Sequence, residues 1–197
     1  MPAEPISAFV LATRNPHKLA EVSRLLAPAG IAVDPLPDNV TLPPEDGETF
    51  AENALPKART AAHATGRPSI ADDSGIESEA LGGVPGVRSA RYAGPHATDQ
   101  ENLDKLLREA PAGSGLRYVC ALAFVQPESG EERVFFGDCT GRLAGEPRGS
   151  GGFGYDPAFI PDADGQNRTM AELSELDKDA ISHRGNAVRA LLEWLSR

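Results

Sequence analysis

The sequence predicts an α/β fold in which a mixed central sheet is flanked by helices. Short apolar runs that are typical of strands alternate along the chain with segments of helical periodicity. Two apolar runs, at 116–126 and 133–140, are joined by the polar segment PESGEE and predict an antiparallel hairpin in the same sheet. The length of 197 residues suits one large core or a two-lobed domain.

The first helix begins with an unusual set of charges. Residues 8–13 predict a strand, and Asn15 followed by Pro16 predicts the N-cap and first residue of a helix. A helix N-terminus carries about half a unit of positive charge and favours acidic residues in its first turn. Here the basic residues are Arg14, His17 and Lys18. Two interpretations stay open: a bound anion such as phosphate, or side chains that simply point into solvent.

The second helix is predicted from a capping box. Residues 35–48 are proline-rich and acidic and predict a loop. Thr49 and Glu52 then form the pattern T-x-x-E, and an apolar face continues to Gly66. Pro56 interrupts this pattern, and a proline inside a helix costs about 3 kcal/mol, so we expect a kink there.

The remaining elements follow from the same signals. They are a short buried strand at 69–75 that runs into a turn, a second turn at 82–86, a helix from the capping box of Thr98 and Glu101 to Pro111, the hairpin, a glycine-rich aromatic loop at 149–161, and a helix capped by Ser182 with Val188, Leu191, Leu192 and Leu195 toward the core. Cys120 and Cys139 lie in strand-like runs and predict two buried thiols, with a disulfide left open.

Charge restricts the possible partners. The net charge of −10 makes the surface repel polyanions, so we expect no binding to nucleic acid or to membranes, and any phosphate site must be local. The N-terminal segment MPAEPISAFVLA lacks a basic region, and its apolar run is too short for a signal peptide or membrane span. We therefore expect a cytoplasmic protein.

Two adjacent carboxylates, Asp72 and Asp73, follow the strand predicted at 69–75. Ligands of α/β sheets gather at the carboxyl ends of strands, and carboxylates suit Mg²⁺, so Asp73 is the favoured metal ligand. Alternatively, both aspartates cap a turn at Ser74 and Gly75. A nucleophilic aspartate of a phosphotransferase is a third interpretation, although its usual D-x-D spacing is missing.

The C-terminal half contains further candidates. His183 and Arg184 again place positive charge at a helix start, where a guanidinium can hold a ligand oxygen. Phe153 is a candidate platform for a base and Asp156 a candidate acceptor for a ring N–H, but Phe153 and Tyr155 could equally be core residues. The sequence has no P-loop pattern and no Cys or His cluster for zinc.

Five motifs resemble one known family. The segments LATRNPHKLAEV, EDGETFAENALPKA, ADDSGIESEALGGVPGVRSARYAG, GGFGYDPAF and AISHRGNA occur in the order seen in the inosine/xanthosine triphosphate pyrophosphatase family, from residue 8 to about 195. The resemblance implies Mg²⁺-dependent hydrolysis of dITP, ITP and XTP to the monophosphate and pyrophosphate. It also implies a homodimer whose subunit, residues 1–197, is a single elongated two-lobed domain with the nucleotide in a cleft between the lobes.

The resemblance further implies a role for each matching residue. Glu45 and Asp73 match the metal positions, and Asp73 also matches the general base. The matching substrate positions are Thr13, Arg14, Asn15, Pro16, His17, Lys18, Lys57, Ser74, Phe153, Gly154, Tyr155, Asp156, Lys178, His183 and Arg184. Among them Thr13, Asn15 and Lys18 would hold the triphosphate, with Lys57 as a second phosphate contact. The residues from Phe153 onward resemble a purine pocket.

The sequence departs from the family pattern at two positions and leaves two rival functions. Arg14 stands where the family often has a smaller residue such as glycine, and Pro56 interrupts a helix that is usually unbroken. The rival enzyme is the related family that hydrolyses dTTP and UTP. The rival of another class is a nucleotide sensor without turnover, which would not need metal carboxylates such as Glu45 and Asp73.

Overall fold

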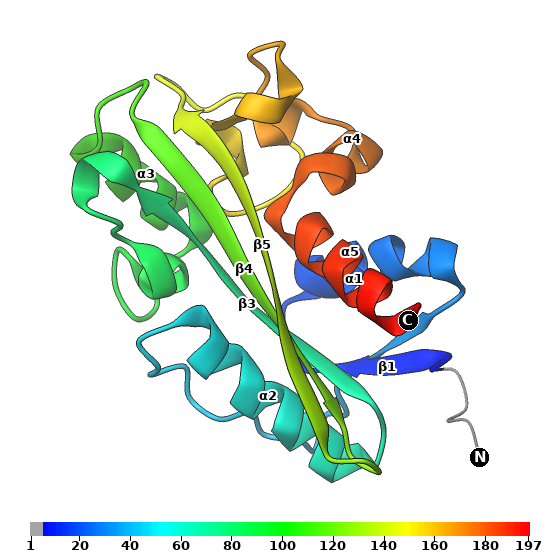
Figure 1. The fold of residues 1–197 in the computed structure, drawn as a ribbon. Coiled ribbons are helices and arrows are strands. Elements are labelled where there is room, and N and C mark those ends of the chain that lie inside the picture. The colour runs from blue at the N-terminus through cyan, green and yellow to red at the C-terminus, as the bar shows by residue number, and fades with distance from the viewer. Residues whose placement is uncertain (1–5) are drawn as a thin grey trace. The chain divides into compact units, whose positions relative to one another are not determined.

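The computed structural model of the chain describes residues 6–197. Residues 1–5, part of the segment expected to lack a signal peptide, lie outside the described residues. The sheet has six strands in the order β2-β1-β3-β4-β5-β6 (Figure 1). β1 pairs in parallel with β2 and β3, whereas β5 pairs antiparallel with β6, so the sheet is mixed, as predicted.

The bounds of the elements are as follows. The strands are β1 (Ala8–Leu11), β2 (Ala32–Pro35), β3 (Ser69–Ser78), β4 (Gly115–Gln126), β5 (Glu131–Leu143) and β6 (Phe159–Pro161). The α-helices are α1 (Pro16–Leu26), α2 (Phe50–Thr65), α3 (Asp99–Glu109), α4 (Glu175–Ile181) and α5 (His183–Leu195). The predicted hairpin corresponds to β4 and β5, while β2, α4 and β6 were not predicted.

The chain divides into two compact units. The first comprises Met1–Asp73, Ala121–Phe136 and Ala187–Arg197, and the second comprises Ser74–Cys120 and Gly137–Asn186.

β3 corrects one expectation about the paired aspartates. The sequence placed a turn at Ser74 and Gly75, but β3 runs without interruption from Ser69 to Ser78. β3 lies between β1 and β4 in the sheet, and β1 pairs with it only at Ser69 and Ile70, so the pairing with β4 is the one that continues the strand past Ile70. This pairing outweighs the local turn preference at Ser74. Asp72 and Asp73 therefore do not cap a turn at Ser74.

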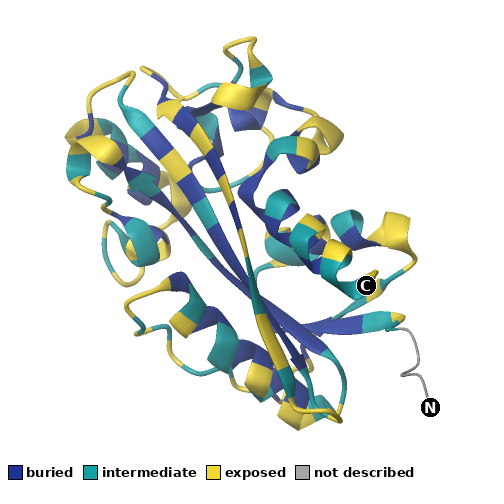
Figure 2. Ribbon diagram, viewed as in Figure 1, coloured by how far each residue is buried: buried dark blue, intermediate teal, exposed yellow. Residues whose placement is uncertain are grey.

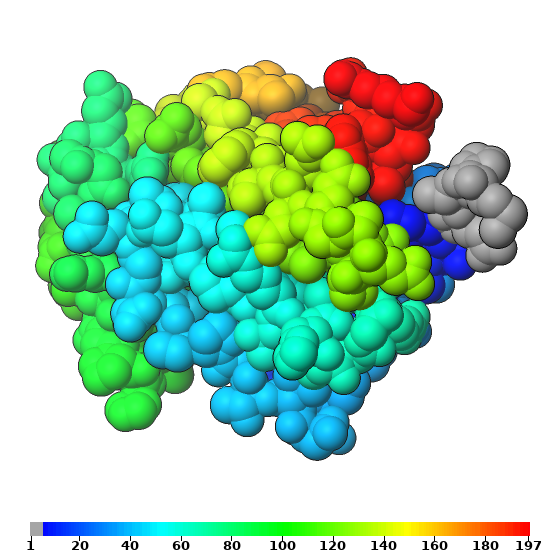
Figure 3. Space-filling model, turned by 60° about the horizontal axis from the view of Figure 1, so that its bottom comes forward, coloured from blue at the N-terminus to red at the C-terminus, as the bar shows by residue number. Residues whose placement is uncertain are grey.

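The helix starts agree with their capping signals. Asn15 caps α1, which begins at Pro16, and Thr49 caps α2 with the predicted capping box. Pro56 lies inside α2 without ending it, and α2 continues to its C-cap at Gly66 (Figure 1). Figure 2 shows that α2 has one buried and one exposed face. On the exposed side, α2 lies beside the hairpin tip, where Arg59 Nη2 donates to Glu132 Oε2 at 2.6 Å (Figure 3).

Each unit has its own apolar packing. In the first unit, Phe9 packs edge-on against Phe124 at 5.9 Å between ring centroids, and Phe124 also contacts Trp194 at 5.2 Å. Val188 and Leu191 of α5 are buried as predicted, whereas the predicted core residues Leu192 and Leu195 are only partly buried.

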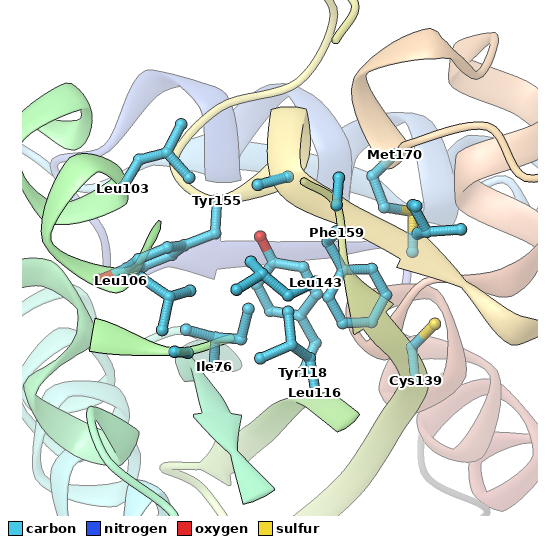
Figure 4. Close-up of a cluster of buried hydrophobic side chains, with 14 of the residues drawn as sticks. Ile76, Leu103, Leu106, Leu116, Tyr118, Cys139, Leu143, Tyr155, Phe159 and Met170 are labelled. Carbon is cyan, nitrogen blue, oxygen red and sulfur yellow. The ribbon is translucent and has the colours of Figure 1, made fainter. Parts of the chain in front are cut away.

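The core of the second unit is built around aromatic side chains. Figure 4 shows Tyr118, Tyr155 and Phe159 converging with Ile76 and aliphatic neighbours. Cys120 and Cys139 are both buried and free, which confirms two buried thiols and answers the open question of a disulfide. No helix within residues 6–197 is long and apolar enough to cross a membrane.

Candidate active site

The first turn of α1 pairs its lysine with a buried carboxylate. Asn15 Oδ1 accepts hydrogen bonds from the main-chain N–H groups of His17 at 2.9 Å and Lys18 at 3.3 Å. Thr13 Oγ1 accepts from the Asn15 N–H at 3.1 Å. Lys18 Nζ lies 3.0 Å from Oδ2 of Asp72, whose side chain is fully buried. The protein itself therefore supplies an anion to this basic helix start, a solution that neither interpretation of the sequence included.

Arg14 holds the loop that precedes α2. Its Nη1 donates to Leu36 O at 2.8 Å, and its Nη2 donates to Pro37 O at 2.7 Å and Val40 O at 2.8 Å. Asp38 Oδ1 lies 3.7 Å from Nη1. The sequence placed Arg14 among the substrate-binding residues. In the structure its guanidinium faces this loop, because a fork of five N–H donors can serve several carbonyl oxygens at once.

Lys57 lies among three aspartate and glutamate residues. Its Nζ donates to Glu45 Oε1 and, at 2.8 Å, to the main-chain oxygen of Asp72, and it lies 3.9 Å from Asp73 Oδ1. Burial lowers the pKa of Lys57, but the charges of Glu45, Asp72 and Asp73 raise it by more, so the net pKa is above its ordinary value. Lys57 is therefore a cation at neutral pH. We call Lys18, Glu45, Lys57, Asp72 and Asp73 the carboxylate–lysine cluster.

Asp73 is held by an amide as well as by charge. Its side chain is 8% exposed, and Asn53 Nδ2 donates to Oδ2 at 2.9 Å. Burial raises the pKa of Asp73, and the charge of Glu45 raises it further. The charges of Lys57 and Lys18 and the hydrogen bond from Asn53 lower this pKa. The net pKa lies above the ordinary aspartate value, because loss of hydration outweighs the neighbouring cations.

The donor set of the carboxylate–lysine cluster fits a magnesium ion. Glu45 and Asp73 both approach the ammonium of Lys57, so two carboxylates converge on one positive charge. Within residues 6–197 no group of three or more His, Cys, Asp or Glu side chains is placed to hold a metal. Mg²⁺ is commonly bound by one or two carboxylates together with substrate phosphates. Glu45 and Asp73 are therefore the residues that would hold it.

Two buried cations face one aromatic ring in the second unit. Lys178 Nζ of α4 lies 5.2 Å from the centroid of the Phe153 ring, and Arg184 Cζ of α5 lies 5.8 Å from it. Lys178 is 6% exposed and Arg184 1%. Cations at this distance are attracted to the face of an aromatic ring. The Phe153 ring thus has two charged hydrogen-bond donors beside it.

Asp156 neutralises one of these cations. Its Oδ2 accepts from Lys178 Nζ at 2.6 Å and from the Phe153 N–H at 2.9 Å, and its Oδ1 accepts from the Tyr118 hydroxyl at 3.1 Å. A Cβ at residue 152 would overlap Asp156 Oδ2, and Gly152 has φ 68°, so glycine is required beside this carboxylate. The sequence predicted Asp156 as an acceptor for a ring N–H, whereas both of its oxygens already accept from the protein. We call Tyr118, Phe153, Asp156, Lys178 and Arg184 the aromatic–cation cluster.

Two predicted pocket residues serve in packing. Tyr155 is 6% exposed within the apolar core, and its hydroxyl donates to Ser89 O at 2.7 Å (Figure 4). Its side chain therefore follows the alternative interpretation, that of a core residue. His183 is 5% exposed, and its ring stacks on Tyr118 at 4.5 Å with an interplanar angle of 7°.

Ser74 and Gly154 lie at the edge of the aromatic–cation cluster. Ser74 Oγ accepts from Arg184 Nη2 at 2.8 Å. Gly154 has φ 62°, and its N–H donates to Asp99 Oδ2 at 3.1 Å. Arg184 is thus held on one side by a hydroxyl and faces an aromatic ring, which fixes the guanidinium.

The two clusters have different chemical capacities. The carboxylate–lysine cluster lies wholly in the first unit and can bind a cation and phosphate oxygens. The aromatic–cation cluster lies wholly in the second unit and can bind a flat ring with acceptor oxygens. Asp73 is the last residue of the first segment of the first unit, and Ser74, the next residue of β3, is the first residue of the second unit.

Asn53 and Tyr118 were missed by the sequence analysis. Asn53 is 3% exposed on α2, and it precedes Lys57 by one helical turn on the same buried face. Two polar residues on an otherwise apolar helix face are the signal that could have identified it. Tyr118 lies in an apolar strand segment that predicts core residues throughout, and no local sequence pattern indicates a role for its hydroxyl.

Comparisons with known proteins confirm the resemblance seen in the five motifs. The Ham1 family model matches residues 9–194. The dITP/XTP pyrophosphatase of Cutibacterium acnes is 47% identical over 195 residues, which cover 95% of each chain. That of Frankia alni is 51% identical over 197 residues, covering 94% of this chain and 96% of that protein. The structure of a HAM1 protein from Coxiella burnetii matches with a TM-score of 0.84 and 41% identity, covering 97% of this chain and 99% of that one. The chain therefore belongs to the Ham1 family.

Proposed function

We propose that this chain is a nucleoside triphosphate pyrophosphatase that hydrolyses dITP, ITP and XTP to the monophosphate and pyrophosphate, and thereby removes deaminated purines from the nucleotide pool. The observation that carries the proposal is the convergence of Glu45 and Asp73 on one cation beside Lys18. A pure nucleotide sensor would not need this pair of carboxylates. The names of the Cutibacterium acnes and Frankia alni relatives agree with the substrate class.

The carboxylate–lysine cluster binds the triphosphate in this proposal. Lys18 has three N–H donors, so it can keep its contact with Asp72 and add a phosphate oxygen. Lys57 stabilises negative charge from the other side, and Thr13 and Asn15 adjoin the same helix start. Glu45 and Asp73 would hold a magnesium ion, which would supply Lewis-acid stabilisation of phosphate oxygens.

Asp73 acts as the general base. Its carboxylate holds a water, accepts one proton from it, and directs the oxygen to the α-phosphorus. The bond to the bridging oxygen breaks, and pyrophosphate leaves with the electron pair while Lys18 and Lys57 stabilise its charge. Positioning and charge stabilisation supply most of the rate in such reactions.

The aromatic–cation cluster selects a keto purine. The base stacks on Phe153, and Lys178 and Arg184 donate to the keto oxygen at position 6. An amino group at this position would meet donors instead of acceptors, because Asp156 already accepts three hydrogen bonds from the protein. The resulting unpaired buried donors disfavour adenine nucleotides.

Product analysis in ¹⁸O-labelled water tests the proposal. The chain is incubated with Mg²⁺ and, separately, with dITP, XTP, dATP, dGTP and dTTP, and the products are separated and weighed by mass spectrometry. We expect monophosphate and pyrophosphate from dITP and XTP, with the label in the monophosphate. Label in pyrophosphate would contradict attack at the α-phosphorus. Turnover of dTTP instead would favour the rival enzyme family, and binding without turnover would favour the sensor.

The proposal also covers the metal dependence, the cellular location and the oligomeric state of the enzyme. We propose dependence on Mg²⁺, which chelation with EDTA and readdition of the ion would test. We also propose a cytoplasmic homodimer. Light scattering of the purified chain measures its mass in solution, and a monomer at micromolar concentration would contradict the dimer.

A further inference from the structure

We propose that Asn53 is a positioning residue that fixes the Asp73 carboxylate and joins it to the loop that carries Glu45. The inference rests on the proposed function, in which Asp73 accepts the proton of the attacking water. Asn53 is the fourth residue of α2 and is 3% exposed. Its Nδ2 donates to Asp73 Oδ2 at 2.9 Å, and its Oδ1 accepts from the Gly47 N–H at 2.8 Å.

The geometry determines which way the Asn53 amide points. A main-chain N–H can only donate, so the amide oxygen must face Gly47. The amide NH₂ group must then face Asp73, and Oδ2 of Asp73 must accept. Oδ1 is the other carboxylate oxygen, and it lies on the side of Lys57, at 3.9 Å from Nζ. Asn53 thus distinguishes the two oxygens of the base and directs Oδ1 to the reacting water.

Gly47 is the second part of this arrangement. A Cβ at residue 47 would lie 2.8 Å from Asn53 Oδ1 and 2.7 Å from Glu52 Cβ, so only glycine lets the loop approach the helix this closely. Glu45 precedes Gly47 by two residues and contacts Lys57. One buried amide therefore links the loop of Glu45 to Asp73, and both carboxylates keep their relative positions when the loop is anchored.

The chain contains a second helix that begins with the same sequence pattern. This second helix provides a control that distinguishes a structural role of the asparagine from a role in catalysis. The pattern T-x-x-E-N occurs at 49–53 and again at 98–102, and each copy forms a capping box. Asn102 is the fourth residue of α3 and is 2% exposed. Its Oδ1 accepts from the Ala93 N–H at 2.8 Å, and its Nδ2 donates to Ala90 O at 3.2 Å.

The two asparagines share one bond and differ in the other. Each accepts from a main-chain N–H of the loop before its helix, which stabilises that loop. Asn102 donates to a carbonyl oxygen, whereas Asn53 donates to the carboxylate proposed as the base. Asn102 is therefore a matched control, because the same substitution removes comparable structural bonds there without touching Asp73.

The test compares Asn53→Asp with Asn102→Asp. Each substitution keeps an acceptor for the loop N–H and replaces the NH₂ donor with an oxygen. Steady-state hydrolysis of dITP at saturating Mg²⁺ and the melting temperature are measured for both variants and the wild type. For Asn53→Asp we expect kcat to fall about 10- to 100-fold, the range seen when hydrogen-bond partners of metal-ligating residues are removed. For the uncharged Asn53→Leu variant, KM should change by less than about threefold, because no phosphate or base contact is lost and no charge is added.

Asn102→Asp should lower the melting temperature less than Asn53→Asp does, because its new oxygen faces a carbonyl and not a carboxylate, and should keep kcat within about twofold of the wild type. Asn53→Leu and Asn102→Leu repeat the comparison without a new charge, which covers the case in which paired carboxylates prevent folding. Equal kcat values for the Asn53 and Asn102 variants would overturn the inference. A rise in KM alone would also overturn it, because Asn53 would then act in binding.

A crystal structure of Asn53→Leu gives a readout that does not depend on turnover. We expect the Asp73 side chain to leave its wild-type conformation and the 45–47 segment to shift. An unchanged Asp73 would overturn the inference. If the wild type releases no pyrophosphate from dITP, the proposed function fails, and the structure still decides whether Asn53 positions Asp73.

Discussion

Gly185→Ala tests how closely the start of α5 must approach α4. Gly185 follows Arg184 in the first turn of α5. A Cβ at this position would overlap the main-chain oxygen of Asp179 and would lie 3.1 Å from Ser182 Oγ. Real Cβ atoms keep at least 3.0 Å from such atoms, and a backbone oxygen cannot move aside as a flexible side chain would. The first turn of α5 must therefore shift away from α4.

The sign of the stability change distinguishes the expected steric overlap, which destabilises the protein, from helix propensity, which alone would stabilise it. Alanine in place of glycine inside a helix stabilises by about 0.5–1 kcal/mol when nothing obstructs it. Overpacking costs about 1–3 kcal/mol, so the variant should lose about 1–2 kcal/mol of unfolding free energy. In a chain of this length that corresponds to a drop of about 2–8 °C in melting temperature. Arg184 moves with the turn, and a misplacement of about 1 Å can cost about 100-fold in kcat/KM.

The assay combines thermal unfolding with kcat/KM for dITP. Gly145→Ala is the control, because a Cβ there meets only Ala112 Cβ at 3.8 Å, an ordinary contact. We expect wild-type values for that variant. A Gly185→Ala protein that melts at or above the wild-type temperature with unchanged kcat/KM would refute the close-approach argument.

Three further substitutions follow from the contacts of the two clusters and of Arg14. Asp73→Asn should reduce kcat for dITP by at least about 100-fold with little change in KM, and a near-normal kcat in steady-state assays would contradict its role as base. Arg184→Ala should narrow the ratio of kcat/KM between dITP and dATP by about 10-fold, and an unchanged ratio would place discrimination elsewhere. Arg14→Ala removes the donors to residues 36–40 and should lower the free energy of unfolding by about 1–2 kcal/mol. It should also make this loop more sensitive to limited proteolysis. Unchanged digestion would show that the loop keeps its conformation without Arg14.

The helix starts could be predicted because their signals are local. Asn15 before Pro16 and the capping boxes at Thr49 and Thr98 place the beginnings of α1, α2 and α3 at the predicted residues. A side-chain oxygen that accepts from an N–H two or three residues later needs no information about the rest of the chain. The same locality explains the failure at Ser74, where the pairing of β3 with β4 outweighs the turn preference.

The pairing of Lys18 with Asp72 required the fold. The sequence shows an excess of basic residues at α1 and two adjacent carboxylates at β3, each as a separate anomaly. The parallel pairing of β1 with β3 joins these parts of the chain, since α1 follows β1 directly. Each group then compensates the other, and the cost of burying Asp72 is reduced by the lysine.

The contacts of Lys57 show why assigning a role to each site residue separately is incomplete. The family resemblance treats Glu45 and Asp73 as metal ligands and Lys57 as a phosphate contact, as if the roles were independent. In the structure the ammonium of Lys57 is stabilised by those same carboxylates, which raise its pKa despite burial. A divalent cation held by Glu45 and Asp73 would weaken their attraction for Lys57 and favour its movement toward a phosphate oxygen. In the proposed function, metal binding and the phosphate contact of Lys57 would therefore be coupled through shared carboxylates, a relation that sequence spacing alone does not contain.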